Sequence, residues 1–362
     1  MIRSCYIHIP FCKKICSYCD FCKVFYKKEL VEKYLLSLET EIDKIYKKEE
    51  LNTIYIGGGT PSSLSLNELK KLFEIIGKLN KKNDCEFTVE CNFETITKEK
   101  LLLFKENGVN RLSFGIESIN CKNLDFLGRK ENKQQIIDTM NIARDLGFSN
   151  INLDLMYAIP GESIADVDED IEFILSLKPE HISTYSLMIE ENTKLYLRHL
   201  KKVDEDIDFL MYNRICSKLK DEYIHYEISN FSLPGFESKH NLCYWKNNEY
   251  YGFGVSASSY RGDIKYTNTK SITKYLKNDY NYYQERVSKS DKMSYEMILG
   301  LRLLSGVSKK EFQKKYGIDI KDYFDIDNLI KNQLLEEDES SYYINEDKLY
   351  ISNEILISFI KE

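Results

Sequence analysis

The chain has 362 residues, 43% of them hydrophobic, which is enough for one large α/β domain and a small appended one. Its net charge of −7 repels a polyanion on average, so we expect no nucleic-acid partner. The first residues lack an apolar leader, and no later stretch approaches the roughly 20 apolar residues that span a bilayer. We therefore expect a cytoplasmic protein without a membrane span, in which the ten cysteines are mostly reduced.

The first half of the chain alternates between apolar or β-branched runs and helical patterns. Six runs are expected to be parallel strands, at residues 5–9, 53–56, 86–91, 111–115, 151–157 and 181–187. Helical patterns separate them at residues 29–47, 66–79, 98–107, 134–146 and 167–177. Because a complete eight-stranded barrel takes about 250 residues, six β-then-α units predict a partial, open (β/α)6 barrel of the α/β class. A doubly wound sheet is the alternative, and either fold places ligands at the carboxyl ends of the strands.

The pattern changes after residue 200. A helix at 204–221 and a strand at 223–229 complete a core domain that we place at residues 1–232. Residues 233–288 are expected to be an irregular connector, since prolines and glycines interrupt the segment 231–260. Short helices at 295–304, 309–316 and 326–332, followed by a hairpin at 342–351, predict a small, mainly helical C-terminal cap at residues 289–362.

Four cysteines follow the first predicted strand within eleven residues: Cys12, Cys16, Cys19 and Cys22. Thiolates are the usual ligands of iron–sulfur clusters, and three of them on one short loop can hold three corners of a 4Fe–4S cube. The fourth iron is then open to a small ligand. A structural zinc site on all four cysteines is the alternative, although such sites usually pair two knuckles that lie a dozen or more residues apart.

Further unusual residues stand at the ends of later strands. A glycine turn containing Gly58 and Gly59 follows the second strand and lets the backbone approach a ligand closely. Carboxylates close the third, fourth and fifth strands, at Glu90, Glu117 and Asp154. Each of these residues alone fits a structural hydrogen bond or a surface ion pair equally well. Their shared location at one edge of the sheet predicts a ligand site.

The spacing C-x3-C-x2-C after a strand, ahead of five more βα units, resembles the radical S-adenosylmethionine (SAM) superfamily. The motifs YIHIPFC, CDF, IGGGTPS, ECN, RLSFGIES, LGR, DLMY and ISTYSL resemble, in order, the oxygen-independent coproporphyrinogen III oxidase-like family over residues 6 to about 195. This resemblance implies that SAM chelates the open iron and that the cluster supplies an electron to split it. It places the cluster on Cys12, Cys16 and Cys19. It places SAM on Tyr6, Tyr18, Gly58, Gly59, Thr60, Glu90, Glu117, Arg129 and Asp154.

The family has two principal branches, a porphyrinogen oxidase and a haem chaperone. The oxidase carries an extra N-terminal segment and a cysteine two positions after the third; here the motif begins at Tyr6, and Cys22 stands one place too late. The pattern HNxxYW, at His240, Tyr244 and Trp245, also resembles the chaperone branch and implies contacts with haem. Alternatively, Trp245 anchors a loop and His240 only hydrogen-bonds. Cys243, at a variable position of the pattern, is another candidate ligand of haem iron.

The leading hypothesis is a haem chaperone that holds a SAM-ligated 4Fe–4S cluster and delivers haem to an acceptor apoprotein. A catalytic radical SAM enzyme, either the porphyrinogen oxidase or a methyltransferase on the same scaffold, is the second hypothesis. A zinc-stapled binding protein is the third. The resemblance implies a flavodoxin or ferredoxin as reductant wherever SAM is cleaved. One departure from the family pattern is Glu117, which stands where glutamine is common and loses an amide donor while it keeps an acceptor.

Overall fold

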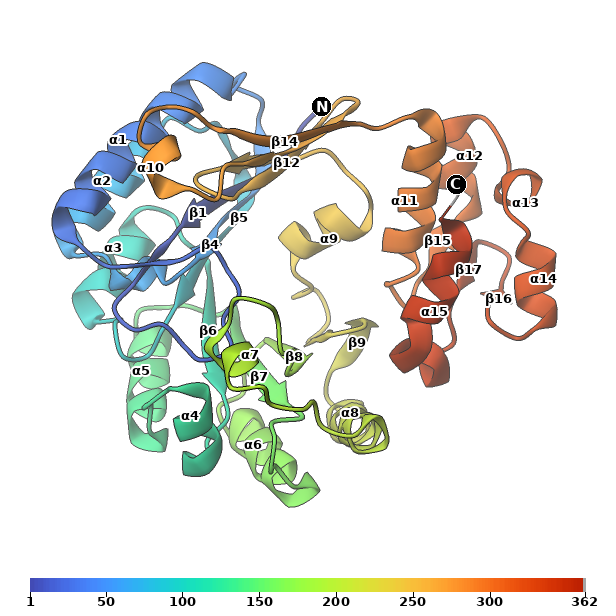
Figure 1. Ribbon diagram of the computed structural model, residues 1–362, viewed down its shortest axis with the longest axis horizontal. Coiled ribbons are helices and arrows are strands. Elements are labelled where there is room, and N and C mark those ends of the chain that lie inside the picture. Colours follow the sequence, from blue (N-terminus) through green and yellow to red (C-terminus); the bar gives the residue numbers. More distant parts are fainter. Residues whose placement is uncertain (361–362) are drawn as a thin grey trace.

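The computed structural model describes residues 1–360, apart from the side chain of Tyr282. Its main element is a nine-stranded sheet whose central strands follow one another around an open arc (Figure 1). In spatial order the strands are β11 (Tyr251–Phe253), β1 (Ser4–Ile9), β4 (Leu51–Gly58), β5 (Lys81–Cys91), β6 (Arg111–Glu117), β7 (Ile151–Tyr157), β8 (His181–Ser186), β10 (Asn230–Ser232) and β9 (Ile224–Glu227).

The six strands from β1 to β8 in this sheet are parallel and stand in chain order, which confirms the predicted partial barrel. A doubly wound sheet would reverse its strand order at a switch point, and no such reversal occurs along these strands. The sheet is wider than expected. β11 adds a parallel strand beside β1, and β10 and β9 add an antiparallel pair beyond β8.

Helices cover the outer, convex face of the sheet (Figure 1). Serine caps start two of them: Ser65 and Ser163 each form a capping box with the acidic residue three positions later. The helices of this layer and its connections are α1 (Lys28–Ile45), α2 (Leu66–Ile76), α3 (Lys98–Glu106), α4 (Cys121–Leu127), α5 (Lys133–Asp145), α6 (Ile164–Ser176), α7 (Lys194–Leu197) and α8 (Glu205–Leu219). A 3₁₀ turn, η1 (Pro61–Ser63), follows β4.

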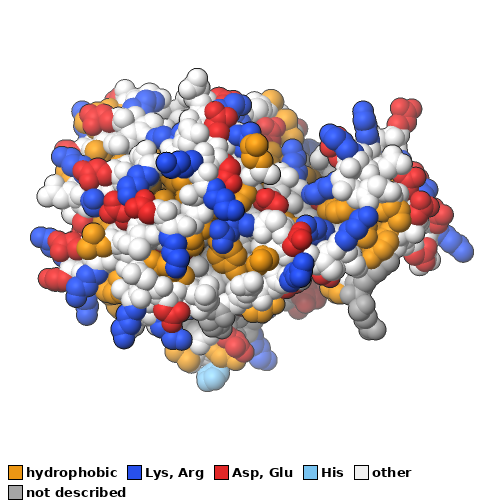
Figure 2. Space-filling view, turned by 90° about the horizontal axis from the view of Figure 1, so that it is seen from above, with side chains coloured by type: hydrophobic (Ala, Val, Ile, Leu, Met, Phe, Trp, Pro, Cys, Tyr) orange, Lys and Arg blue, Asp and Glu red, His pale blue; other side chains and the backbone are white. Residues whose placement is uncertain are grey.

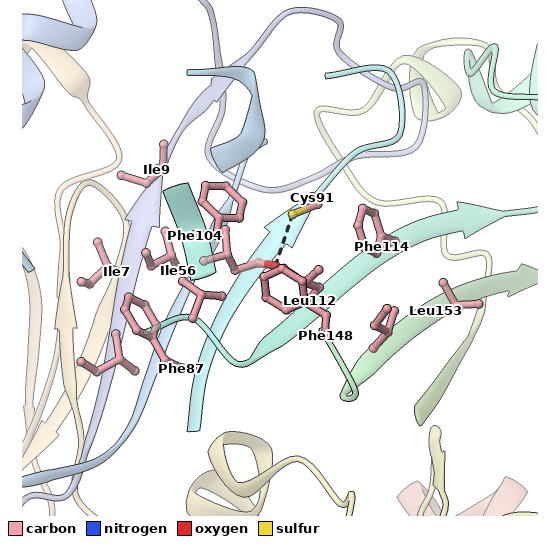
Figure 3. Packing of buried hydrophobic residues seen from close by; sticks show 14 of the residues in the cluster. Ile7, Ile9, Ile56, Phe87, Cys91, Phe104, Leu112, Phe114, Phe148 and Leu153 are labelled. Carbon is pink, nitrogen blue, oxygen red and sulfur yellow. Dashed lines mark hydrogen bonds between the residues drawn. The ribbon is translucent and has the colours of Figure 1, made fainter. Parts of the chain in front are cut away.

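The main core lies between the sheet and these helices. Alternate strand residues point into it, among them Ile7, Ile56, Phe87 and Leu112, and Phe104 reaches it from α3 (Figure 3). Each such side chain contributes about 1.5–3 kcal/mol when fully buried. Because the outer-facing positions fill the core, the positions between them face the hollow of the barrel.

Residues 233–288 contain regular elements, so the expectation of an irregular segment was wrong. A short helix, α9 (Lys239–Trp245), lies on the concave side of the sheet (Figure 1). An antiparallel sheet of β12 (Ser258–Arg261), β13 (Ile264–Asn268) and β14 (Asn281–Arg286) follows it, with α10 (Ile272–Tyr275) between the last two strands. The Pro234-Gly235 turn comes just before α9, which Ser238 caps.

The last residues form a separate, mainly helical body with its own core around Met297 and Phe312 (Figure 1). The expected hairpin at 342–351 is wrong. The pairing lies earlier, between β16 (Glu336–Glu337) and β17 (Ser341–Tyr343). In place of the hairpin, Asn345 caps a 3₁₀ helix, η2 (Glu346–Ile351). The remaining elements are α11 (Lys289–Gly300), β15 (Val307–Ser308), α12 (Lys309–Tyr316), α13 (Ile320–Tyr323), α14 (Ile326–Lys331), α15 (Ser352–Leu356) and η3 (Ile357–Phe359).

Within residues 1–360, no helix is both long and apolar enough to cross a membrane. The division into core, connector and cap at residues 232 and 288 stays a prediction.

Candidate functional site

A cavity of about 410 Å³ opens at the carboxyl ends of the central strands, and we refer to it as the carboxyl-end cavity. The cysteine loop forms one wall and the inner-facing strand residues form the other. Its lining includes most of the residues predicted from the sequence: Cys12, Cys16, Cys19, Tyr18, Gly58, Gly59, Thr60, Glu90, Glu117, Arg129 and Asp154. The structure therefore brings these residues together around one space. Tyr6 lies beside it on β1, where its hydroxyl and His8 Nδ1 share a hydrogen bond of 2.9 Å.

The cysteine loop runs from β1 to α1 and is fixed to the barrel at several points. Two short strands, β2 (Phe11–Cys12) and β3 (Val24–Phe25), pair across its base. The backbone of Ser17 accepts from Leu195 N at 3.1 Å and donates to Leu127 O at 2.8 Å. His8 Nε2 shares a hydrogen bond of 2.7 Å with the carbonyl of Cys22. These contacts hold the loop over the cavity in a defined shape.

Three of the four loop thiols face the carboxyl-end cavity and one does not. Cys22 lies apart from its lining, and its thiol donates instead to Lys270 O at 3.5 Å. Burial raises the pKa of Cys12 to about 11, and Thr60 Oγ1 lies 3.6 Å from its sulfur. Without a metal these groups are therefore thiols, and a bound cation would be needed to hold them as thiolates.

The donor set suits a cluster better than a single ion. Within residues 1–360, no three His, Cys, Asp or Glu side chains converge closely enough to hold one metal ion. A zinc ion needs all its sulfurs about 2.3 Å away, whereas a cubic cluster takes each thiolate on a different iron. The glycine turn packs closely against the cysteine loop, because a Cβ on Gly59 would stand 2.7 Å from Pro10 C and 3.0 Å from Cys12 Sγ, so no side chain fits at this position.

The glycine turn after β4 holds one carboxylate of the cavity in place. Gly58 has a φ of +117°, a conformation that side chains rarely adopt, and its N–H donates to Glu90 Oε2 at 2.9 Å. The hydroxyl of Tyr55 donates to the other carboxylate oxygen, Oε1, at 2.8 Å. Burial nevertheless raises the pKa of Glu90 above its usual value. This carboxylate is thus fixed in position and short of compensating positive charge.

A second carboxylate stands on a distorted strand end. The register between β6 and β7 shifts at Gly115 and Glu117, and Glu117 has a φ of +63°. Such a bulge re-aims a side chain, and left-handed backbone in a non-glycine residue stores strain that often marks a functional site. Glu117 Oε1 accepts from Tyr18 OH at 2.9 Å and from Arg129 Nη1 at 3.3 Å. Burial raises the pKa of Glu117 to about 7 even so.

Arg129 links this carboxylate to a third group. Its Nη2 donates to Glu131 Oε1 and to Gly115 O, each at 2.6 Å, and its side chain is only 6% exposed. The guanidinium is thus shared between two buried carboxylates and a strand carbonyl. The LGR motif therefore contributes to the site through the ion pairs of Arg129 with Glu117 and Glu131.

Asp154 lies on the inner face of β7 and accepts from Asn152 Nδ2 at 2.8 Å. Burial raises its pKa to about 6, and the charge of Glu90 adds to the rise. Arg111 lines the same cavity and is 2% exposed, and its side chain makes no hydrogen bond or ion pair with any residue that the structure describes. Lys14 lines the cavity too, and its buried Nζ likewise has no partner in the described chain. A cavity that holds both carboxylates and unpaired cations suits a ligand that carries charged groups of both signs.

The HNxxYW residues lie in α9, on the inner side of the barrel. His240 is 1% exposed: Nδ1 shares a hydrogen bond of 2.8 Å with Thr53 Oγ1, and Nε2 shares one of 2.8 Å with Tyr244 OH. Its ring also stacks on Tyr55. Trp245 lies under the guanidinium of Arg302, and its buried Nε1 has no partner within the described chain. As it lies, His240 has no free nitrogen for iron, and its role toward haem stays a prediction.

Several inner-facing residues were missed by the sequence reasoning: Tyr55, Arg111, Ser113, Asn152, Ser183 and Tyr185. A signal for them exists in the strands themselves. RLSFGIE, INLDLMY and HISTYS alternate polar and apolar residues, whereas a parallel strand buried on both faces is apolar throughout. That alternation indicates a polar barrel interior.

Residues 6–174 match the family model of the radical SAM superfamily, and residues 287–346 match that of the HemN C-terminal domain. These matches define the class: a radical SAM domain followed by a HemN-type C-terminal domain. A Bacillus subtilis protein named Heme chaperone HemW is 39% identical over 380 aligned residues, which cover 100% of both chains. The Lactococcus lactis protein of the same name is 38% identical over 99% of this chain and 97% of its own. The chain therefore belongs to the HemW family of radical SAM proteins.

More distant relatives agree. The Escherichia coli protein named Heme chaperone HemW is 30% identical over 99% of this chain and 98% of its own. The solved structure of coproporphyrinogen III oxidase (HemN) from Escherichia coli, a radical SAM enzyme, matches with a TM-score of 0.87 over 99% of this chain and 90% of its own. At 21% identity that match shows the fold alone.

Proposed function

We propose that this protein is a cytoplasmic haem chaperone, which binds haem and a SAM-ligated 4Fe–4S cluster and delivers haem to an acceptor apoprotein. The observation that carries the proposal is the full-length similarity to proteins named Heme chaperone HemW. All ten cysteines fall in the described part of the chain and are free thiols, which supports a reducing compartment.

We assign the cluster to Cys12, Cys16 and Cys19, since these three thiols face the carboxyl-end cavity and Cys22 does not. When bound, the cluster and SAM supply a reducing electron and a source of an organic radical. A flavodoxin or a ferredoxin is the class of partner that would supply that electron.

We assign SAM to the same cavity. Its ammonium and sulfonium groups supply positive charge beside the carboxylates of Glu90 and Asp154, which have no ion-pair partner in the described chain, and beside Glu117, which shares Arg129 with Glu131. Arg111 offers an unpaired cation to the ligand's carboxylate. The backbone at the glycine turn permits close approach. The full set that we assign to SAM is Tyr6, Tyr18, Gly58, Gly59, Thr60, Glu90, Glu117, Arg129 and Asp154.

The haem contacts that we propose at His240, Tyr244 and Trp245 require a change in α9. Both nitrogens of His240 are already bonded, so ligation of iron by this residue must break its bond to Thr53 or to Tyr244. Local unfolding of this short, seven-residue helix would release His240 from these hydrogen bonds.

Titration of the anaerobically reconstituted protein with haemin tests the proposal. We expect one haem per chain, followed by loss of the haem band when a haem-free acceptor protein is added. His240→Ala should weaken uptake, whereas His199→Ala, at an exposed position, should leave it unchanged. Absence of stoichiometric haem uptake by the unmodified protein contradicts the proposal.

A catalytic radical SAM enzyme acting on a porphyrinogen, or a methyltransferase, is the second candidate. It is favoured by the apolar side of the cavity, where Met156, Leu187 and Met188 leave wall area suited to a flat substrate. Anaerobic incubation with coproporphyrinogen III, SAM and a strong reductant distinguishes the two functions. We expect no decarboxylated or methylated product. Turnover would favour the enzyme instead.

A further inference from the structure

A second, larger cavity lies at the opposite end of the barrel, and we call it the amino-end cleft. It measures about 1000 Å³ and separates the amino ends of β1 and β4 from the C-terminal body. Helix α9 forms one wall. The first turn of α11 and the end of α12 form the other. Its size exceeds what a single small anion fills and falls at the upper end of small-molecule sites.

The amino-end cleft is strongly basic although the whole chain carries a net charge of −7. Its lining holds seven cationic side chains against two carboxylates. The cations are Arg3, Lys239, Lys246, Arg286, Lys289, Lys292 and Lys315, and the carboxylates are Glu249 and Asp263. In the space-filling view, Lys and Arg side chains stand on both sides of the notch between the main body and the C-terminal body (Figure 2).

Four of these cations have no carboxylate of their own. Lys292 pairs with Asp263 at 2.5 Å, Lys315 with Glu296 at 2.5 Å, and Arg3 with Glu50 at 3.3 Å. The other four make no ion pair with any residue in the described part of the chain: Lys239, Lys246, Arg286 and Lys289. Mutual repulsion of unpaired like charges is unfavourable, so an anion bound between them would be stabilised.

Local structure directs these charges into the cleft. Lys239, Leu242 and Lys246 are spaced by three and four residues and therefore share one face of α9. Lys289 begins α11, a twelve-residue helix whose positive end is already offset by the capping carboxylate of Asp291, so the lysine itself is the charge that it brings to the cleft. Between the charges lie apolar surfaces, from Leu242 on α9 and Tyr316 on α12.

We propose that the amino-end cleft is where the protein carries haem, with the propionates on Lys246, Arg286 and Lys289 and the macrocycle against Leu242 of α9. This inference rests on the proposed haem binding and adds its place. Carboxylates at one edge of a flat apolar body match cations around an apolar wall. His240 points away from this face, into the barrel, so it reaches haem in the cleft only when the proposed local unfolding of α9 releases it from Thr53 or Tyr244.

Haemin and its dimethyl ester, which lacks both propionate charges, are the probes. The full-length triple variant Lys246→Gln/Arg286→Gln/Lys289→Gln is compared with a matched triple at exposed helix positions, Lys33→Gln/Lys70→Gln/Lys98→Gln. Because the cleft variant loses charge-assisted contacts on a partly exposed rim, its Kd for haemin should be about 10- to 100-fold higher than that of the unmodified protein. The matched triple should bind haemin like the unmodified protein, and the dimethyl ester should bind both triples equally.

Salt gives a readout that needs no variant. Raising ionic strength should weaken haemin binding to the unmodified protein more than binding of the dimethyl ester, because only haemin carries charges to screen. Equal haemin Kd values for the cleft variant and the unmodified protein overturn the assignment and leave haem binding intact. Retained haemin affinity with lost delivery also overturns it, since the cleft would then dock a protein. Failure of the unmodified protein to bind haemin overturns the proposed function as well.

Discussion

The Glu117–Arg129 network at the carboxyl end of the barrel and the cations at its amino end differ in how their charges are compensated. At the carboxyl end, Glu117 and Arg129 are buried and hydrogen-bonded to each other and to their surroundings. At the amino end, Lys246, Arg286 and Lys289 border an open cleft and have no ion-pair partner among the described residues. The first arrangement contributes to folding as well as to binding. The second contributes little to folding, so its charges are free to serve a ligand.

The largest expected effect is at the carboxyl end, where loss of a single cysteine of the loop should remove the whole cluster. Replacing Cys12, Cys16 or Cys19 by alanine should each abolish the cluster, since each thiolate holds a separate iron. Cys22→Ala is the matched control and should keep its iron, because its thiol points to Lys270. Iron and sulfide analysis after anaerobic reconstitution measures the effect. Equal loss in the Cys22 variant, or stoichiometric zinc in place of iron, would refute the three-cysteine cluster.

Arg129→Ala tests whether the carboxyl-end charges stabilise the fold. It leaves Glu117 and Glu131 buried without their cation, which should lower the free energy of unfolding by about 3–5 kcal/mol. Arg214→Ala removes an exposed pair with Asp168 and should cost only about 0–1 kcal/mol. Urea unfolding of both variants measures the difference. Similar losses in the two would show that the buried network adds no stability.

Glu41 provides a buried carboxylate outside both cavities. It accepts from Tyr275 OH at 2.6 Å, Gly254 N at 2.8 Å and Asn268 Nδ2 at 2.6 Å. Glu41→Gln puts an amide donor opposite at least one of these donors and should cost about 1–3 kcal/mol. Thermal and urea unfolding near pH 4.5, the pKa of this carboxyl in the unfolded chain, measure it.

The pH dependence of that loss has a defined sign. Burial raises the pKa of Glu41 to about 7, above its value in the unfolded chain. Its contribution to stability is therefore fully present below about pH 4.5 and is lost as the pH rises through 7. The difference in unfolding free energy between the unmodified protein and Glu41→Gln should shrink over that interval. A difference that grows with pH would contradict the raised pKa.

The smallest expected effect belongs to the amino-end cleft. Arg286→Gln breaks no ion pair within the described chain and should change the free energy of unfolding by less than about 0.5 kcal/mol. Urea unfolding in low salt, without haem, is the measurement. A loss as large as that for Arg129→Ala would mean that the cleft cations hold the two bodies together, and the contrast between the ends would disappear.

Much of the barrel could be predicted from sequence because its strands combine length with regular spacing. β1, β6 and β7 are apolar on one face and follow one another at βα spacing, so their existence and order were readable. β11 was not, since Tyr251–Phe253 is three residues long and its partner β1 lies far away in the chain. Strands of that length are defined by their neighbours and carry almost no local signal.

The candidate site was predictable to a similar extent. Cys12, Cys16 and Cys19 stand out by spacing, and the carboxylates stand out because charge is rare inside a strand. Arg111 was missed because an arginine at the start of a strand reads as an exposed residue. The burial of His240 was also beyond the sequence, because it depends on Thr53 and Tyr55, about 185 residues earlier in the chain.

Helix α9 forms a partition between two compartments. Asn241 lines the carboxyl-end cavity, while Leu242 and Cys243, the next residues, line the amino-end cleft. A ligand in one cavity that shifts α9 would alter the shape of the cavity on the other side of the helix. Thermodynamic reciprocity then requires that the change be mutual: the free energy by which SAM alters haem affinity equals that by which haem alters SAM affinity. If SAM and haem bind where we propose, each would therefore affect the binding of the other without contact, through α9.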